Sequence, residues 1–189
     1  MFSQYSSAAH ILSPEQVLLG LLNQRPAHGY ELNQRLQADL GQVWRLGLNQ
    51  TYAILGRLEE RGFIQCLDAA PASQARRRRY ALTESGRARF ERWLGTPTPA
   101  TVRAVRVEFT TRLYFAAALS PELAGRLLEE QVADTRRSCD RLTATLAALP
   151  EAEVFNRLGL RLRVRTMVSL LDWLEECRQV VDGRPPADG

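Results

Sequence analysis

Four consecutive arginines are the most concentrated charge in this sequence. Each guanidinium group is always charged and carries five N–H donors, which suits it to binding phosphate oxygens. A solvated loop is the alternative, and the run alone does not decide between the two interpretations. Its members are Arg76, Arg77, Arg78 and Arg79, followed by a tyrosine and by the stretch ALTESG.

A second group of polar residues lies earlier, in the stretch LNQTYAILGRLEERG. Asparagine and glutamine amides can make paired hydrogen bonds to adenine edges, and tyrosine and arginine can contact phosphates. Apolar residues recur here at helical spacing, which places the polar residues on the opposite side of a helix. That side is either a polar face in water or a DNA-contacting face, and the candidate DNA contacts are Asn49, Gln50, Thr51, Tyr52 and Arg57.

The remaining candidates for chemistry have weaker support. His28 has Glu31 three residues away, but the only other histidine is His10, so we expect a packed, hydrogen-bonded histidine between helices. The three cysteines are scattered, without the spacing of a metal site. No Ser-His-Asp, Cys-His or phosphate-loop pattern occurs, so we expect no enzyme, no metal and no cofactor.

Three short helices are predicted before the arginines. Ser13-Pro14 begins the first, because serine caps helices and proline fits the first turn. His28-Gly29 predicts a turn, and the apolar spacing over 30–40 predicts the second helix. Asn49 is the expected cap of the third helix, and Gly62 its end.

A hairpin with basic residues follows these helices. The runs FIQCL at 63–67 and RRYAL at 78–82 predict two strands, and Thr83 predicts the cap of a fourth helix. Three helices and a basic hairpin form the winged helix-turn-helix arrangement. In this arrangement the arginine run lies at the tip and second strand of the wing, which follows the duplex backbone or enters a minor groove. The context therefore favours phosphate binding over a solvated loop.

The second half of the chain is predicted to be helical, over about 101–118, 121–148 and 151–181. In the last helix, Arg157, Arg161 and Arg165 form a basic stripe, which we expect to pair with acidic residues of the preceding helix. In the middle helix, residues spaced alternately by four and three form a weak pairing seam. The seam residues are Leu128, Val132, Thr135, Cys139, Leu142, Leu146 and Leu149.

The predicted fold class is mostly α with a small β-hairpin. A winged helix-turn-helix DNA-binding domain is expected at 1–95, a helical dimerisation and effector domain at 101–182, and a flexible tail at 183–189. The Pro-rich stretch TPTPA at 96–100 is the expected linker. We predict a homodimer, because such long amphipathic helices are hard to bury within one chain.

Charge is distributed unevenly between the two halves. The formal net charge is +4, and residues 1–95 contain 12 arginines against eight acidic residues, whereas residues 96–189 contain 13 of each. The first half is therefore expected to meet a polyanion. No apolar run approaches the ~18 residues of a membrane helix, and no signal peptide is evident, so a cytoplasmic protein is expected.

Three segments of the first half resemble the PadR family of bacterial transcriptional regulators. They are LLGLLNQRPAHGYELNQRL, TYAILGRLEERGFI and RRRRYALTESGRARFERWL. The second half is similar, more loosely, to the helical domain of the larger PadR subfamily. The resemblance implies a homodimeric regulator, usually a repressor, that binds a roughly palindromic double-stranded operator and often responds to small aromatic or lipophilic effectors. The alternative is a winged protein–protein interaction module without DNA binding.

The start of the recognition helix departs from the family pattern, and two tryptophans are candidates for effector binding. PadR proteins usually carry Gly-Thr-Leu-Tyr-Pro at the start of the recognition helix, whereas this chain has Asn-Gln-Thr-Tyr-Ala ending at Ala53, which implies a different base preference. Trp93 and Trp173 lie on either side of the expected linker and are the candidate effector contacts. The alternative for these tryptophans is the core or the dimer interface.

Overall fold

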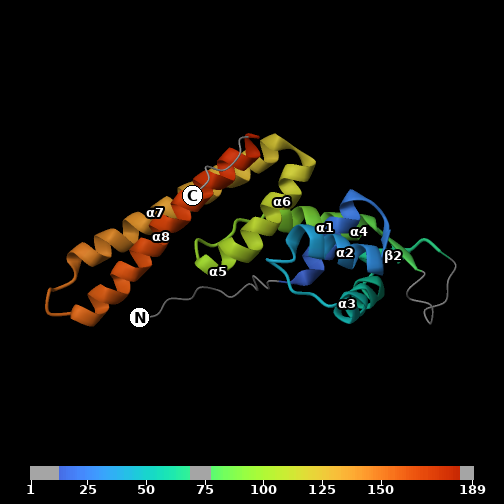
Figure 1. Ribbon diagram of the computed structural model, residues 1–189, viewed down its shortest axis with the longest axis horizontal. Helices are drawn as coiled ribbons and strands as arrows, with labels where there is room; N and C mark the ends of the chain where they lie inside the picture. The colour runs from blue at the N-terminus through green and yellow to red at the C-terminus, as the bar shows by residue number, and fades with distance from the viewer. Residues whose placement is uncertain (1–12, 69–77, 184–189) are drawn as a thin grey trace. The chain divides into compact units, whose positions relative to one another are not determined.

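The computed structural model describes residues 13–68 and 78–183 of a chain that divides into two compact units, 1–93 and 94–189 (Figure 1). The elements of the first unit are α1 (Pro14–Gln24), β1 (Ala27–His28), α2 (Gly29–Leu40), α3 (Leu48–Glu60), β2 (Ile64–Cys66), β3 (Arg79–Leu82) and α4 (Glu84–Leu94). Those of the second are α5 (Val102–Ala104), the π-helical turn η2 (Val105–Phe109), α6 (Thr110–Leu119), α7 (Pro121–Ala148) and α8 (Val154–Val181).

Helix α1 is the central element of the first unit. Its residues from Val17 to Leu22 are all buried, because α2, α3 and β3 pack around it. The predicted start is confirmed: the Oγ of Ser13 accepts a hydrogen bond from the backbone N–H of Glu15 at 3.3 Å, and Pro14 occupies the first turn. Burial of each leucine here contributes about 1.5–3 kcal/mol to the stability of the fold. Packing against α1 therefore fixes the positions of α2 and α3.

The basic hairpin is confirmed, and it belongs to a three-stranded antiparallel sheet of order β1-β3-β2. The two predicted strands appear as Ile64–Cys66 and Arg79–Leu82. The predicted turn at His28-Gly29 is wrong, because Ala27 pairs with Tyr80 and His28 pairs with Arg79. This third strand depends on a partner far away in the sequence, so no local pattern announces it.

The third helix begins before the predicted cap at Asn49. Gly47 is the N-cap, and Asn49 already lies in the first turn. The side-chain Oε1 of Gln50 accepts a hydrogen bond from the N–H of Gly47 at 3.0 Å. The N–H of Thr51 donates to the carbonyl of Gly47 at 3.0 Å. The start of α3 is therefore fixed by Gln50, which acts as the capping-box residue.

Helices α7 and α8 run antiparallel, side by side, in the second unit (Figure 1). Val105, Phe109, Leu128 and Leu174 form a buried cluster, against which Val132 of α7 also packs. The α7 seam therefore begins on residues of its own chain. Two residues of the predicted seam, Leu128 and Val132, thus pack within their own chain.

The predicted helix at 101–118 is interrupted by the π-helical turn. There the Oγ1 of Thr110 donates to the carbonyl of Val105 at 3.2 Å, five residues back. The wider turn places Glu108 and Arg112 together in the interior, with side chains only 4% and 1% exposed and a 2.6 Å contact between them. Arg112 also donates to the Oγ1 of Thr98. The expected linker is thus anchored to the second unit through a buried threonine.

The expected ion pairs of the basic stripe are not found. Arg157 donates instead to the backbone carbonyls of Leu146 and Leu149, at 3.3 and 2.6 Å, and so caps the end of α7. In the part of the chain that the structure describes, Arg161 and Arg165 make no ion pair. No helix within residues 13–68 and 78–183 has the length and apolar character needed to cross a membrane.

Candidate nucleic-acid interface

One side of α3 is polar and open to solvent. Ile54, Leu55 and Leu58 are buried, whereas Asn49, Gln50, Ala53, Arg57 and Glu60 are exposed. These exposed positions recur at spacings of three or four residues, so they form one stripe along the helix. The predicted contacts Asn49, Gln50 and Arg57 therefore share a face, as a helix that enters a major groove requires.

Gln50 has a structural role in addition to the predicted one. Its Oε1 accepts the N–H of Gly47, but no partner of its side-chain NH₂ group is found among the described residues. The amide donor is therefore available to a base edge while the amide oxygen holds the helix start. Any test of this residue has to separate these two roles.

Thr51 is a correction to the predicted set of contacts. Its side chain is fully buried. The Oγ1 donates to the carbonyl of Gly47 at 3.2 Å and accepts from the Nδ2 of Asn33 at 3.0 Å. A side chain enclosed in this way cannot reach DNA, so Thr51 fixes α3 against α2 and does not contact the ligand. Thr51 precedes the buried residues Ile54 and Leu55 by three and four positions, so helical spacing alone places it on the buried face of α3.

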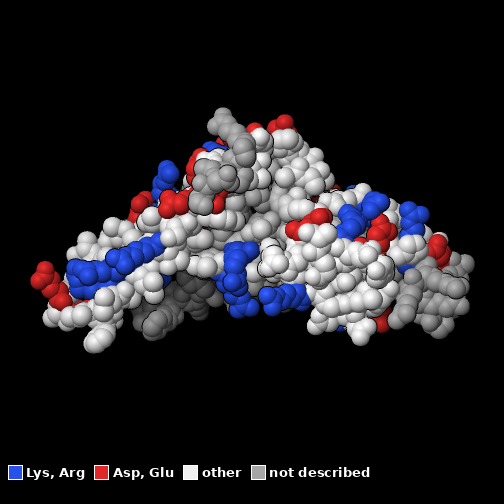
Figure 2. Space-filling model, in the orientation of Figure 1, with Lys and Arg blue, Asp and Glu red and all other residues white. Residues whose placement is uncertain are grey.

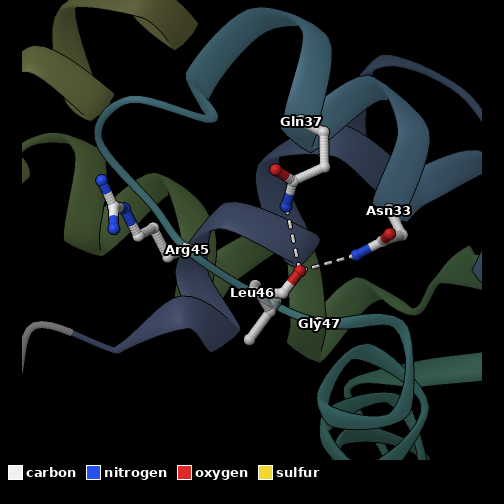
Figure 3. Close-up of a pocket in the computed structure, with 5 residues that line it drawn as sticks. All are labelled: Asn33, Gln37, Arg45, Leu46 and Gly47. Atoms are coloured by element: carbon white, nitrogen blue, oxygen red, sulfur yellow. Dashed lines mark hydrogen bonds between the residues drawn. The ribbon is translucent and has the colours of Figure 1, made fainter.

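The turn between α2 and α3 is held by two amide side chains. Asn33 and Gln37 both donate to the carbonyl of Leu46, each at 2.9 Å (Figure 3). With Arg45 and Gly47 they line an open hollow of about 420 Å³. Arg45 is exposed and has no ion-pair partner within the described residues. Arg45 is not among the DNA contacts predicted from the sequence, although a basic residue just before a predicted recognition helix was a usable signal.

Tyr52 packs against the start of α2. A methyl group built on Gly29 would lie only 2.5 Å from the Cε1 of the Tyr52 ring. The ring is half-buried. Glycine at position 29 is therefore what allows the Tyr52 ring to pack so closely against α2. The exposed part of Tyr52 is what can contact a phosphate.

One arginine of the wing, Arg78, already forms an ion pair within the protein. Arg78 donates to both carboxylate oxygens of Glu59 in α3, at 2.7 and 2.5 Å, and lies over the ring of Tyr80. This bond to Glu59 raises the pKa of Arg78 above its ordinary value. The backbone N–H of Arg79 donates to Asp68 at 2.7 Å, and its side chain is exposed. The predicted contacts Arg76 and Arg77 lie outside the described residues.

His28 is half-buried between β1 and α2, and its Nδ1 has no hydrogen-bond partner within the described part of the chain. Residues 13–68 and 78–183 contain no cluster of three or more histidine, cysteine, aspartate or glutamate side chains that could hold a metal ion. The prediction of a packed, hydrogen-bonded histidine between helices therefore needs correction, because His28 is the last residue of β1 and its Nδ1 is unpartnered among the described residues.

The two candidate effector tryptophans each contact an aromatic neighbour within their own unit. The ring of Trp93 lies 5.9 Å from that of Phe90, and the ring of Trp173 meets that of Phe109 edge-on at 6.3 Å. Trp173 also packs against the buried cluster of the second unit. Neither tryptophan lines the hollow beside α3.

Two family models match the chain. The model of the transcriptional regulator PadR-like family matches residues 18–92, and a model of the C-terminal part of virulence activator alpha matches residues 105–182. Among curated proteins, the negative transcriptional regulator PadR of Bacillus subtilis is 27% identical over 176 residues, which are 87% of this chain and 95% of the relative.

Two solved structures of Bacillus subtilis PadR are also similar. The complex with operator DNA is 25% identical, covers 88% of this chain and 98% of that one, and has a TM-score of 0.41. The complex with p-coumaric acid is 26% identical, covers 93% and 99%, and has a TM-score of 0.40.

The two family models together account for both units, one for the helices and wing and the other for the helices that follow. The exposed polar stripe of α3 and the confirmed wing agree with the first model. The chain therefore carries a domain of the PadR-like family of transcriptional regulators at residues 18–92, followed by a C-terminal helical domain of the virulence activator alpha type at residues 105–182.

Proposed function

We propose that this protein is a homodimeric, sequence-specific repressor that binds a roughly palindromic DNA operator. The observation that carries the proposal is the exposed polar stripe of α3, together with the hydrogen bonds that hold both ends of this helix in place. Asn33 and Gln37 fix the turn before α3, and Glu59 joins the helix to the wing. A rigid helix with exposed amides is what base recognition in a major groove requires.

The proposed contacts fall into two classes. Asn49 and Gln50 contact base edges, because their amides are exposed at the start of α3. The residues that contact phosphates are Arg45, Tyr52, Arg57, Arg76, Arg77 and Arg79. Arg78 supports the wing from within, since its guanidinium is already bound to Glu59.

The assignment as a repressor is supported by the family and by the curated relative, whose name is that of a negative regulator. The proposal assigns no enzymatic activity and no cofactor to the chain. The first unit binds DNA, and the second provides dimerisation and the response to an effector.

The effector is proposed to be a small aromatic or lipophilic compound that contacts Trp93 or Trp173. The support is the aromatic surroundings of each ring, with Phe90 beside one and Phe109 beside the other. Such a compound can weaken DNA binding only by preferring one arrangement of the dimer. A tenfold loss of operator affinity requires about 1.4 kcal/mol of differential binding. Titration with p-coumaric acid, followed by tryptophan fluorescence and operator binding, tests this part.

The proposed phosphate contacts are tested by combining Arg76→Ala, Arg77→Ala and Arg79→Ala while keeping Arg78. We expect weaker binding to every duplex, and a log–log salt slope reduced by about two to three units. The matched control removes three exposed arginines of the second unit, Arg103, Arg126 and Arg136, and should leave both quantities unchanged. No binding of the unaltered protein to any duplex at low salt would instead support the interaction-module alternative.

A further inference from the structure

Helix α3 presents different charges at its two ends. Its backbone dipole gives the first turn a partial positive charge and the last turn a partial negative charge. The exposed stripe of α3 begins with the neutral amides of Asn49 and Gln50 and ends with two charged side chains, Arg57 and Glu60. The carboxylate of Glu60 therefore adds to the negative end of the helix, whereas the amides lie at its positive end.

The side chains that flank Glu60 are each bound to another part of the first unit. Its neighbour Glu59 accepts two hydrogen bonds from Arg78, at 2.7 and 2.5 Å. The next residue, Arg61, contacts the carboxylate of Glu15 at 3.4 Å. Glu60 itself is exposed, and no ion-pair partner of it is found within residues 13–68 and 78–183. Its negative charge is thus available to act on a ligand of α3.

Glu60 lies in line with a residue that is proposed to contact bases. It follows Ala53 by seven residues and Asn49 by eleven, which are close to two and three full turns. The directions of the three side chains therefore differ by only about 20° around the helix. A recognition helix contacts bases with its N-terminal residues, and Glu60 lies about 16 Å further along the axis than Asn49. The major groove is only about 12 Å wide, so Glu60 reaches the phosphates that border it.

We propose that Glu60 is a specificity-determining residue, which repels DNA phosphates and so weakens binding to non-cognate duplex. Non-specific binding is held almost entirely by attraction between protein cations and phosphates, so a carboxylate on the DNA-facing stripe lowers it directly. On the cognate operator, the base contacts of Asn49 and Gln50 hold α3 in one position, in which Glu60 stops short of the phosphates. This inference rests on the proposed function and adds a residue that discriminates by repulsion.

Arg57 and Glu60 act in opposite directions on the same stripe. Arg57, about one turn before Glu60, is proposed to bind a phosphate, whereas Glu60 excludes one. Together they limit how far α3 can move along the groove without losing its phosphate contact. Exposed charges act over only about 8 Å at physiological ionic strength. On the face shown in Figure 2, basic and acidic side chains of the first unit are interspersed, so individual side chains determine the local potential.

The test is removal of the Glu60 charge in the full-length protein. Glu60→Gln keeps the size of the side chain and should raise the affinity for random duplex about three- to tenfold. The affinity for an operator selected from random sequences should change less than about twofold, so the preference for the operator falls. The log–log salt slope for random duplex should become steeper. Glu60→Asp keeps the charge and should retain most of the preference.

Glu91→Gln on α4 is the matched control, because Glu91 is exposed and the change in net charge is the same. It should leave both affinities unchanged. Equal effects of Glu60→Gln and Glu91→Gln, or an unchanged affinity of Glu60→Gln for random duplex, would overturn the proposed repulsion. So would a loss of operator affinity alone, which would make Glu60 a base contact. If the unaltered protein bound neither duplex at low salt, the proposed function itself would be overturned.

Discussion

Arg78 of the wing donates two hydrogen bonds to Glu59 of the recognition helix, at 2.7 and 2.5 Å. The two side chains are only 14% and 27% exposed, so this bridge is largely shielded from water. It connects two elements that are proposed to meet different parts of the same DNA site. The wing is therefore held at a fixed place relative to α3, and one arginine of the basic run is used for that purpose.

Removal of this bridge should lower the stability of the first unit. In a cycle of Glu59→Ala, Arg78→Ala and the double variant, we expect a coupling free energy of unfolding of about 1–3 kcal/mol. Urea unfolding measures it. Arg79→Ala is the control, because its side chain is exposed, and it should change stability by no more than about 0.5 kcal/mol. A coupling near zero would return Arg78 to the set of phosphate contacts.

The two roles of Gln50 can be separated by two substitutions. Gln50→Glu keeps an oxygen that accepts the N–H of Gly47 but removes the amide donor, whereas Gln50→Ala removes both. We expect both variants to lose about 1–3 kcal/mol of preference for the cognate operator over random duplex. Only the alanine variant should lose thermal stability. If Gln50→Glu kept the full preference, base recognition by this side chain would be refuted.

Gly86 permits α4 to approach the start of β2. A methyl group built on it would lie 1.9 Å from the backbone oxygen of Phe63, which cannot move away as a side chain can. Gly86→Ala should therefore lower the free energy of unfolding by about 1–3 kcal/mol. Gly56 of α3 has no atom within 4 Å of such a methyl group, so Gly56→Ala should be neutral or stabilising by up to about 1 kcal/mol. Equal effects of the two changes would contradict the close approach.

Cys177 should be an unreactive thiol. Its burial in the second unit, with a smaller contribution from nearby Glu176, raises the pKa of Cys177 to about 12. In a protein with Cys66→Ser and Cys139→Ser, alkylation at pH 8 should be at least about tenfold slower than for a free cysteine, because the thiolate is the reactive form. The difference should vanish in denaturant. Rapid alkylation of the native protein would contradict this.

The same shift makes stability depend on alkaline pH. The unfolded thiol ionises near its ordinary pKa of about 8.5, whereas the folded thiol stays neutral until about pH 12. Its contribution is therefore fully present below about pH 8.5 and is lost as the pH rises toward 12. Replacement of Cys177 by alanine should flatten this part of the stability profile, which urea unfolding at several pH values would show.

Local signals predicted most elements of the fold. Ser13-Pro14 starts α1, because a capping hydroxyl and a proline of fixed φ act within one turn. The wing strands also followed from local patterns. The strand β1 did not, because its pairing with Tyr80 and Arg79 is a contact across many residues.

The site was predictable in its location and less so in its details. The stretch that contains Asn49 and Gln50 was found because their residue types and their helical spacing are local properties. The buried position of Thr51 depends on its hydrogen bond with Asn33, and Arg78 forms an ion pair with Glu59. Both partners are distant in the sequence and come close only in the folded protein. Side chains that support a site therefore look the same in sequence as side chains that contact the ligand.

The most direct test of the central claim is selection of bound sequences from a pool of random DNA duplexes. We expect enrichment of an inverted repeat whose half-sites are about 10 base pairs apart, or a multiple of this, because a two-fold dimer presents its recognition helices one helical turn apart. The selected sequence should bind at least about 10³-fold more tightly than random duplex. Recovery of no enriched sequence, together with no binding at low salt, would contradict the account.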